Sequence, residues 1–217
     1  MSFNNNTYAD SGGFLTTALV PGFTIQGIPS LTPPPFISGV NGKGIDVSDL
    51  TNWVDYFWAN DSSLDTTQKG AIDFWFMKTG PGAASWPTIV DWRNARPSIR
   101  MNTSGNLSAY WVNSSIDSDN AAVTTNTVPT APVTLNQWHH VSFSWFMPVA
   151  GSKYPSGHYE FYYDGKLSDQ GTFDLPVVSS YQTGAGSARE IKLGTGASKF
   201  QGYIDEFHAF NEPLFEY

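Results

Sequence analysis

Apolar and polar residues alternate along several short segments, which is the pattern of β-strands that lie half-buried in a sheet. In segment 71–77, Ile72, Phe74 and Phe76 alternate with Asp73 and with further bulky residues, so both faces of this strand are large and a central strand is expected. The same reasoning predicts strands at 44–47, 88–92, 98–101, 107–112, 138–146, 159–163, 191–193 and 200–210.

The segments between these strands are rich in turn-forming residues. Asp164-Gly165 directly follows the strand at 159–163 and predicts a tight hairpin. Residues 113–132 have the composition of a polar loop, and no long helical pattern occurs. Many short strands separated by polar turns predict an all-β sandwich or barrel.

The first 40 residues differ from the rest of the chain. They are polar at first, then rich in proline and glycine, and end in Pro33, Pro34, Pro35 and Phe36. Consecutive prolines impose an extended conformation and cannot donate to a sheet ladder. We therefore expect residues 1–40 to form an extended arm, either draped over the surface or docked on a neighbouring subunit. Residues 41–217 are then expected to form one domain.

Composition narrows the classes of partner. Aromatic residues make up 15% of the chain and charged residues 14%, so apolar side chains are abundant and the surface carries few charges. The formal net charge of −8 is unsuited to nucleic-acid phosphates and to anionic membranes, and we expect neither partner. The chain has no cysteine, which excludes disulfides and thiolate metal sites.

The start of the sequence does not resemble a secretory leader. It lacks the basic residues and the unbroken apolar core of a signal peptide. No apolar run approaches the length of a membrane span. If the protein acts outside a cell, no signal peptide in this sequence accounts for its export.

Six segments occur in an order that is typical of a known fold: GVNGKGIDVSD, GAIDFWFMKTG, LNQWHHVSFSW, YEFYYDGKL, IKLGTG and FQGYIDEFHAFNEPL. Together they resemble the laminin-G-like branch of the concanavalin A-like lectin/glucanase superfamily, over about residues 36–215. The resemblance implies a jelly-roll β-sandwich of two antiparallel sheets. It implies less about function, because this fold carries binding, catalytic and structural proteins.

Asp205 and Glu206 are adjacent carboxylates on the last predicted strand. Neighbouring residues of a strand point to opposite faces, so these two cannot flank one bond of a substrate. Alternation places Asp205 on the face of Phe207 and Ala209, which we expect to be the core, where a carboxylate must be hydrogen-bonded or bind a metal. The resemblance implies a structural tie to the segment near Asp46, through backbone hydrogen bonds or through calcium.

No catalytic residue is expected. The glucanases of the superfamily carry Glu-x-Asp-x-x-Glu or a close variant on one strand face, and this chain lacks it. Glu160 and Asp164 share a strand parity but are separated by about 13 Å along an extended strand. The adjacent His139 and His140 point to opposite faces, so we expect a hydrogen-bonded His139 beside the core and His140 on the surface.

Sugar recognition requires exposed aromatic rings with polar neighbours. The candidates are Trp58, Trp86 in PGAASWP, Trp92 and Tyr154. The alternative is that most of these rings fill the core.

Three functions are compatible with these features. The first is a non-catalytic structural or decorating component of a larger particle, such as a bacteriophage virion, with the arm contacting other subunits and a surface that binds glycans. The second is a separate carbohydrate-binding lectin or adhesin, assisted by calcium. The third, a glycoside hydrolase, is disfavoured by the missing carboxylate motif. The first two predict a location on a virion surface or outside the cell.

Overall fold

A computed structural model describes residues 35–48, 54–57, 69–81, 86–93, 98–102, 104–112, 122–124, 132–146, 157–172, 190–194, 200–210 and 212–215. These residues form the strands β1 (Phe36–Ser38), β2 (Lys43–Asp46), β3 (Val54–Phe57), β4 (Lys69–Lys78), β5 (Thr88–Arg93), β6 (Ser98–Met101), β7 (Leu107–Val112), β8 (Ala122–Thr124), β9 (Trp138–Phe146), β10 (His158–Tyr163), β11 (Lys166–Gly171), β12 (Glu190–Leu193) and β13 (Gly202–Phe210). The described ranges contain no helix, and accordingly none that is long and apolar enough to span a membrane.

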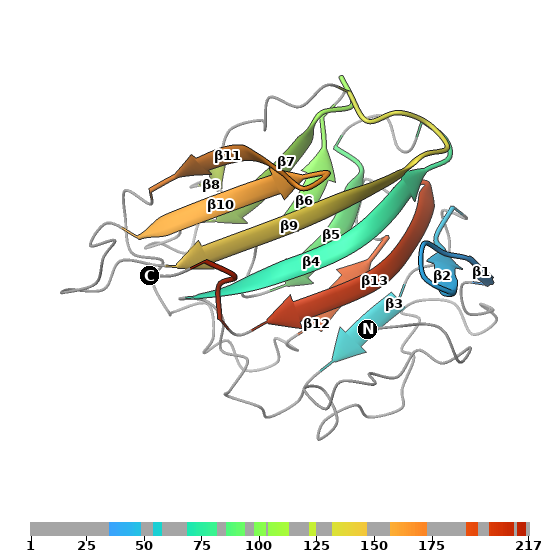
Figure 1. The fold of residues 1–217 in the computed structure, drawn as a ribbon, viewed down its shortest axis with the longest axis horizontal. Coiled ribbons are helices and arrows are strands. Elements are labelled where there is room, and N and C mark those ends of the chain that lie inside the picture. The colour runs from blue at the N-terminus through green and yellow to red at the C-terminus, as the bar shows by residue number, and fades with distance from the viewer. Residues whose placement is uncertain are drawn as a thin grey trace.

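The strands form two sheets that lie one behind the other (Figure 1). The seven-stranded sheet has the order β1-β2-β13-β4-β9-β10-β11, and the six-stranded sheet has the order β3-β12-β5-β6-β7-β8. Neighbouring strands of both sheets pair antiparallel. The expectation of an all-β jelly-roll sandwich is therefore confirmed.

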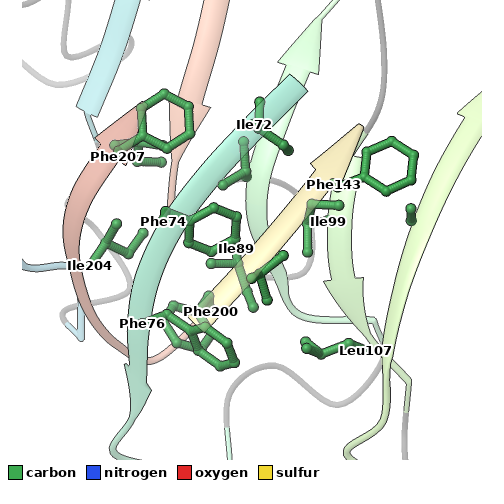
Figure 2. Packing of buried hydrophobic residues seen from close by; sticks show 14 of the residues in the cluster. Ile72, Phe74, Phe76, Ile89, Ile99, Leu107, Phe143, Phe200, Ile204 and Phe207 are labelled. Carbon is green, nitrogen blue, oxygen red and sulfur yellow. The ribbon is translucent and has the colours of Figure 1, made fainter. Parts of the chain in front are cut away.

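The core fills the space between the two sheets (Figure 2). Phe74 on β4 and Phe207 on β13 contact each other with ring centroids 6.1 Å apart, and both are fully buried. Ile89 and Ile99 approach from the six-stranded sheet and are also fully buried. Burying such large apolar side chains is the main stabilising contribution to the sandwich.

Most strands lie where alternation predicts them, and four others were not predicted. The pattern does not reveal β1, β3 or β11, although the hairpin predicted at Asp164-Gly165 implies a strand after the turn. The prediction that residues 113–132 form only a polar loop is wrong, because β8 lies within this range and pairs with β7. At three residues, β8 is too short for a periodic signal.

The hairpin between β10 and β11 turns as predicted. Asp164 and Gly165 have φ values of 49° and 73°. Two consecutive positive values match the tight hairpin turn that Asp-Gly favours, because its twist suits antiparallel strands.

Candidate functional site

The seven-stranded sheet has a face that points away from the core, which we call the outer face. On β4, Ile72, Phe74 and Phe76 are fully buried in the core. Because alternate residues of a strand point to opposite sides, Asp73 and Trp75 lie on the outer face. Both are only partly buried, so this face is accessible to solvent.

Four side chains from three adjacent strands form an imidazole–carboxylate group on the outer face. We call it the Asp73 cluster; it consists of Asp73 on β4, His140 on β9, and Glu206 and His208 on β13. Asp73 Oδ2 lies 3.1 Å from His140 Nε2, and Asp73 Oδ1 lies 3.9 Å from His208 Nδ1. His208 Nε2 lies 3.8 Å from Glu206 Oε2. His208 is the most accessible member, with 42% of its side chain exposed.

The two imidazoles stabilise the ionised form of Asp73. Burial alone would raise the pKa of this carboxyl, but contacts with His140 and His208 outweigh it and lower the pKa from 3.8 to about 2. The contact with His140 is of hydrogen-bond length, whereas the 3.9 Å contact with His208 is not. We therefore assign the larger part of the decrease in the Asp73 pKa to His140. Asp73 is therefore a permanent acceptor for hydroxyl groups at neutral pH and cannot act as a general acid there.

Aromatic rings adjoin the Asp73 cluster. The ring of Trp75 lies 4.9 Å from that of His140, its cross-strand neighbour, at an interplanar angle of 49°. Two residues further along β4, Met77 pairs with Trp138 on β9 and with Tyr203 on β13. The ring centroids of Trp138 and Tyr203 lie 6.4 Å apart. All are half-buried. The outer face thus combines aromatic surface with hydrogen-bond acceptors and donors.

A β-bulge on β13 brings Glu206 and His208 to this face. Asp205 pairs with Trp75 and His208 pairs with Asp73, so β13 has one extra residue between these pairs. Glu206 in the bulge has φ of 46°. Its Oε1 is buried, without a hydrogen-bond partner among the described residues. The bulge shifts the alternation, so that Ile204 faces the core before it and Phe207 after it.

The prediction that Asp205 faces the core is wrong, because the bulge falls between it and Phe207. Asp205 shares the side of Trp75, yet it is fully buried. The loop between β1 and β2 covers it: Oδ2 accepts hydrogen bonds from the backbone N–H of Val40 at 2.7 Å and of Asn41 at 3.2 Å. Oδ1 accepts the N–H of Glu206 at 2.8 Å. Backbone hydrogen bonding to the N-terminal segment was expected, and it is confirmed.

The environment of Asp205 explains two further features. Burial raises its pKa above the usual value, although the three backbone donors oppose the rise. The carboxylate approaches the backbone so closely that a Cβ at Gly39 would collide with Oδ2. Gly39 is therefore required by the close approach of the loop to this side chain.

Calcium at Asp46 and Asp205 was the alternative to backbone hydrogen bonding, and in the structure both carboxylates accept hydrogen bonds. Asp46 Oδ1 accepts the backbone N–H of Ser48 at 2.8 Å and also the Ser48 hydroxyl. Within the described ranges, no group of three histidine, aspartate or glutamate side chains is arranged to hold a metal ion. Calcium needs six to eight oxygens, so these two carboxylates would need further oxygen ligands to form the site that the resemblance implies. Calcium binding at Asp46 and Asp205 stays a prediction.

Of the four aromatic candidates for sugar binding, only Trp86 has a side chain that the structure describes. Trp58 and Tyr154 lie outside the described residues. Trp92 lies on β5, but only its backbone is described. Trp86 precedes β5 on the six-stranded sheet and is 38% exposed. Its ring lies 4.7 Å from the guanidinium carbon of Arg100. That Trp86 contacts a ligand stays a prediction.

The proposed assembly arm is described only at its end. Pro33 and Pro34 lie outside the described residues. Pro35 is exposed, and its carbonyl accepts the N–H of Asp46 at 2.9 Å. Phe36 belongs to β1 and packs against the core, so its side chain stabilises the domain itself.

The two adjacent histidines lie as expected. His139 is buried, and its Nδ1 lies 2.9 Å from Asp164 Oδ2 and 2.7 Å from the Tyr163 hydroxyl. Its Nε2 lies 2.8 Å from the hydroxyl of Thr134. Hydrogen bonds on both nitrogens identify His139 as a structural residue of the hairpin end. His140 lies on the other side of β9 and belongs to the Asp73 cluster.

Sequence reasoning missed the Asp73 cluster as a unit. Asp73 was noted only as part of one face of a central strand, and His140 only as a surface residue. The cluster depends on which strands are neighbours, and β13 lies beside β4 although more than 120 residues separate them in the chain. An aspartate and a tryptophan two residues apart on one strand face are the local signal that could have indicated the site.

Comparison with solved structures shows the same fold in sugar-binding domains. Domain 4 of a GH43 extracellular arabinanase from Geobacillus stearothermophilus, in complex with arabinotriose, has a TM-score of 0.62 at 17% identity; the match covers 99% of this chain and 91% of that one. The CBM40 of a Ruminococcus gnavus sialidase, bound to α2,3 sialyllactose, has a TM-score of 0.52 at 15% identity, covering 83% and 91%. The binding domain of botulinum neurotoxin DC, in complex with SialylT, has a TM-score of 0.55 at 16% identity, covering 84% and 42%.

Sequence comparison assigns the family. No curated protein matches the chain. A family model described as the concanavalin A-like lectin/glucanases superfamily matches residues 51–216, which is most of the chain. Together with the two antiparallel sheets, this match shows that the chain belongs to the laminin-G-like group of the concanavalin A-like lectin/glucanase superfamily.

Proposed function

We propose that this protein is a non-catalytic glycan-binding domain whose ligand lies on the outer face of the seven-stranded sheet. The observation that carries the proposal is the position of Trp75 beside the ionised Asp73 cluster on a solvent-accessible sheet face. Aromatic rings offer a flat surface to the C–H faces of a sugar, and carboxylates accept hydrogen bonds from its hydroxyls.

The donors and acceptors of the cluster match those of a polyol. The Asp73 carboxylate accepts hydroxyl hydrogens, and Glu206 Oε1 is an acceptor for which no partner occurs in the described ranges. The imidazoles of His140 and His208 donate or accept according to their tautomer. A sugar hydroxyl does both, so adjacent hydroxyls of one ring satisfy a mixed cluster of this kind.

The structural relatives support a sugar as the ligand. The arabinanase domain holds arabinotriose and the CBM40 domain holds sialyllactose, as their descriptions state. Each shares less than a fifth of its residues with this chain, so the relatives support the class of ligand and identify no particular sugar.

Binding without hydrolysis fits the chemistry of the cluster. A glycosidase needs one carboxyl that is protonated at working pH, and Asp73, with a pKa of about 2, is ionised. The sequence also lacks the superfamily's catalytic carboxylate motif. We therefore expect bound oligosaccharides to be recovered intact.

A glycan array probed with the full chain tests the proposal. Wild-type protein should bind at least one class of neutral oligosaccharide. Trp75→Ala should weaken this binding at least about tenfold, or about 1.4 kcal/mol, and Asp73→Asn should also weaken it. Trp75→Tyr should keep part of the affinity, because a smaller aromatic ring remains.

Leu167→Ala is the matched control, since this apolar residue is 44% exposed on β11, away from the cluster. It should bind as the wild type does, and all variants should unfold cooperatively. Equal binding by wild type and Trp75→Ala would place the ligand elsewhere. A folded wild type that binds no glycan contradicts the proposal.

A role as a surface component of a larger particle, such as a virion, is the second candidate. The observation in its favour is that Pro35 and Phe36 are fixed at the edge of the seven-stranded sheet, so whatever precedes them leaves the domain from one defined place. The test is co-purification of the chain with assembled particles, with and without residues 1–34. Unchanged incorporation of the shortened chain would exclude an assembly role for the arm.

A further inference from the structure

The loop between β1 and β2 carries the one Asn-Gly pair of the sequence, Asn41-Gly42. Strands β1 and β2 lie at one edge of the seven-stranded sheet (Figure 1). Both residues of the pair are exposed, and Gly42 has φ of 89°, a left-handed conformation that glycine adopts without steric cost. The N–H of Gly39 donates to the Gly42 carbonyl at 3.0 Å, so the two ends of the loop are held together. The pair is therefore presented to water in an ordered turn.

The groups that could react with each other in this pair are both available. In an asparagine that is followed by glycine, the next backbone nitrogen can attack the side-chain amide carbon. Gly42 has no Cβ to shield its nitrogen, and its N–H makes no hydrogen bond to the described residues. The Asn41 side-chain amide makes none to them either. Nothing in the described part of the chain therefore holds the nucleophile or the amide away from the other.

Asn102 is the contrasting case within the same protein. Its Oδ1 accepts hydrogen bonds from the backbone N–H of Ser104 at 2.9 Å and of Asn106 at 3.0 Å. The residue that follows it in the sequence is Thr103, whose branched Cβ shields the backbone nitrogen. The side chain of Asn102 is thus committed to its turn, and we expect it to be unreactive.

We propose that Asn41 deamidates in the folded protein through a cyclic succinimide. The Gly42 nitrogen gives its proton to water or hydroxide and bonds to Cγ of Asn41, and the side-chain nitrogen leaves as ammonia. Water then opens the ring: attack at Cγ gives aspartate, and attack at the main-chain carbonyl gives isoaspartate, in which the backbone continues through Cγ. The net change consumes water and releases ammonia, with no oxidation or reduction. This modification does not depend on glycan binding.

The modified loop is the one that covers Asp205. The N–H groups of Val40 and Asn41 supply two of the three backbone donors to this fully buried carboxylate. Isoaspartate lengthens the backbone by a methylene group directly after the second of these donors. The loop has no slack to absorb it, because even a Cβ at Gly39 would collide with Asp205 Oδ2. We therefore expect isoaspartate to draw donors away from Asp205 and to destabilise the domain.

The decisive measurement compares the folded chain with a free peptide. The full-length protein and the synthetic peptide GVNGKG are kept side by side at pH 8, and conversion is followed by mass spectrometry and by enzymatic methylation of isoaspartate. Less than about one chain in a thousand of a stable domain is unfolded, so a reaction that required unfolding would be at least about 1,000-fold slower than in the peptide. Reaction in the native loop should stay within about tenfold of the peptide rate, because exposed loops open at little cost.

Asn41→Gln is the matched control, because it keeps an amide on a longer side chain that closes a ring much less readily. Position 41 of this variant and Asn102 of the wild type should stay unmodified. The purified isoaspartate form should melt at least about 2 °C below fresh protein, whereas stored Asn41→Gln should melt as it did when fresh. Conversion at least about 1,000-fold slower than in the peptide overturns the proposal. An isoaspartate form that melts with the fresh protein would overturn the effect assigned to the loop over Asp205.

Discussion

Replacing Asp73 by asparagine tests whether the imidazole–carboxylate cluster exists in solution. In the folded protein the pKa of this carboxyl is about 2, against its ordinary value of 3.8 in the unfolded chain. The difference of about 1.8 pH units corresponds to about 2.4 kcal/mol at 1.36 kcal/mol per unit. Since 25% of the side chain is exposed, solvent screening reduces this to about 1–2 kcal/mol.

The sign of the pH dependence follows from the direction of the shift. Between pH 2 and 3.8 the unfolded chain binds more protons at Asp73 than the folded protein does. The stabilisation is therefore complete above about pH 5 and is lost as the pH falls toward 2. Asp73→Asn lacks this contribution at every pH. The difference in unfolding free energy between wild type and variant should shrink by about 1–2 kcal/mol on acidification.

Urea unfolding followed by tryptophan fluorescence, at intervals from pH 6 to pH 2.5, measures this difference. Glu212→Gln serves as the control, because this glutamate is 51% exposed and pairs with Lys69 at the surface. Its effect should stay within about 1 kcal/mol throughout. A wild-type to Asp73→Asn difference that is the same at pH 6 and pH 2.5 would refute the assigned pKa and, with it, the contact between Asp73 and His140.

Two glycines give further predictions. Gly39→Ala should destabilise the domain by about 1–3 kcal/mol in urea unfolding, because the added Cβ would collide with the Asp205 carboxylate and lie 2.8 Å from the backbone nitrogen of Gly44; a neutral effect would mean that the loop over Asp205 is open in solution. Gly165→Ala should cost about 1 kcal/mol and lower the melting temperature, because φ is 73° although no atom lies within 4 Å of the new Cβ. An unchanged melting temperature would argue against the positive-φ turn.

The parts of the fold that could be predicted are those that depend on local pattern. Alternation located β4, β6, β7 and β9 to within two residues, since one buried face imposes a period of two. Asp164-Gly165 specified its turn because few residue pairs accept two positive φ values. The resemblance to a known family then supplied the number of sheets, which no local pattern contains.

The parts that could not be predicted depend on pairing between distant strands. The bulge at Glu206 inverts the alternation of β13, so the burial of Asp205 was foreseen while its face was not. The sequence near Glu206 gives no sign of the bulge. The residue that adopts a positive φ there is a glutamate, and glutamate is not one of the residues that predict a turn. Trp86 was singled out for exposure, but its contact with Arg100 requires the pairing of β5 with β6.

The place of β13 in the seven-stranded sheet determines when the domain can fold. This strand, Gly202–Phe210, lies between β2 and β4, which come from the first 78 residues. During synthesis, β2 and β4 must therefore wait with unpaired edges until more than 120 further residues have been made. Such long-range pairing slows folding and leaves sheet edges exposed to other chains. A ribosome that stalls before residue 202 would release a product without a closed sandwich, prone to associate through those edges.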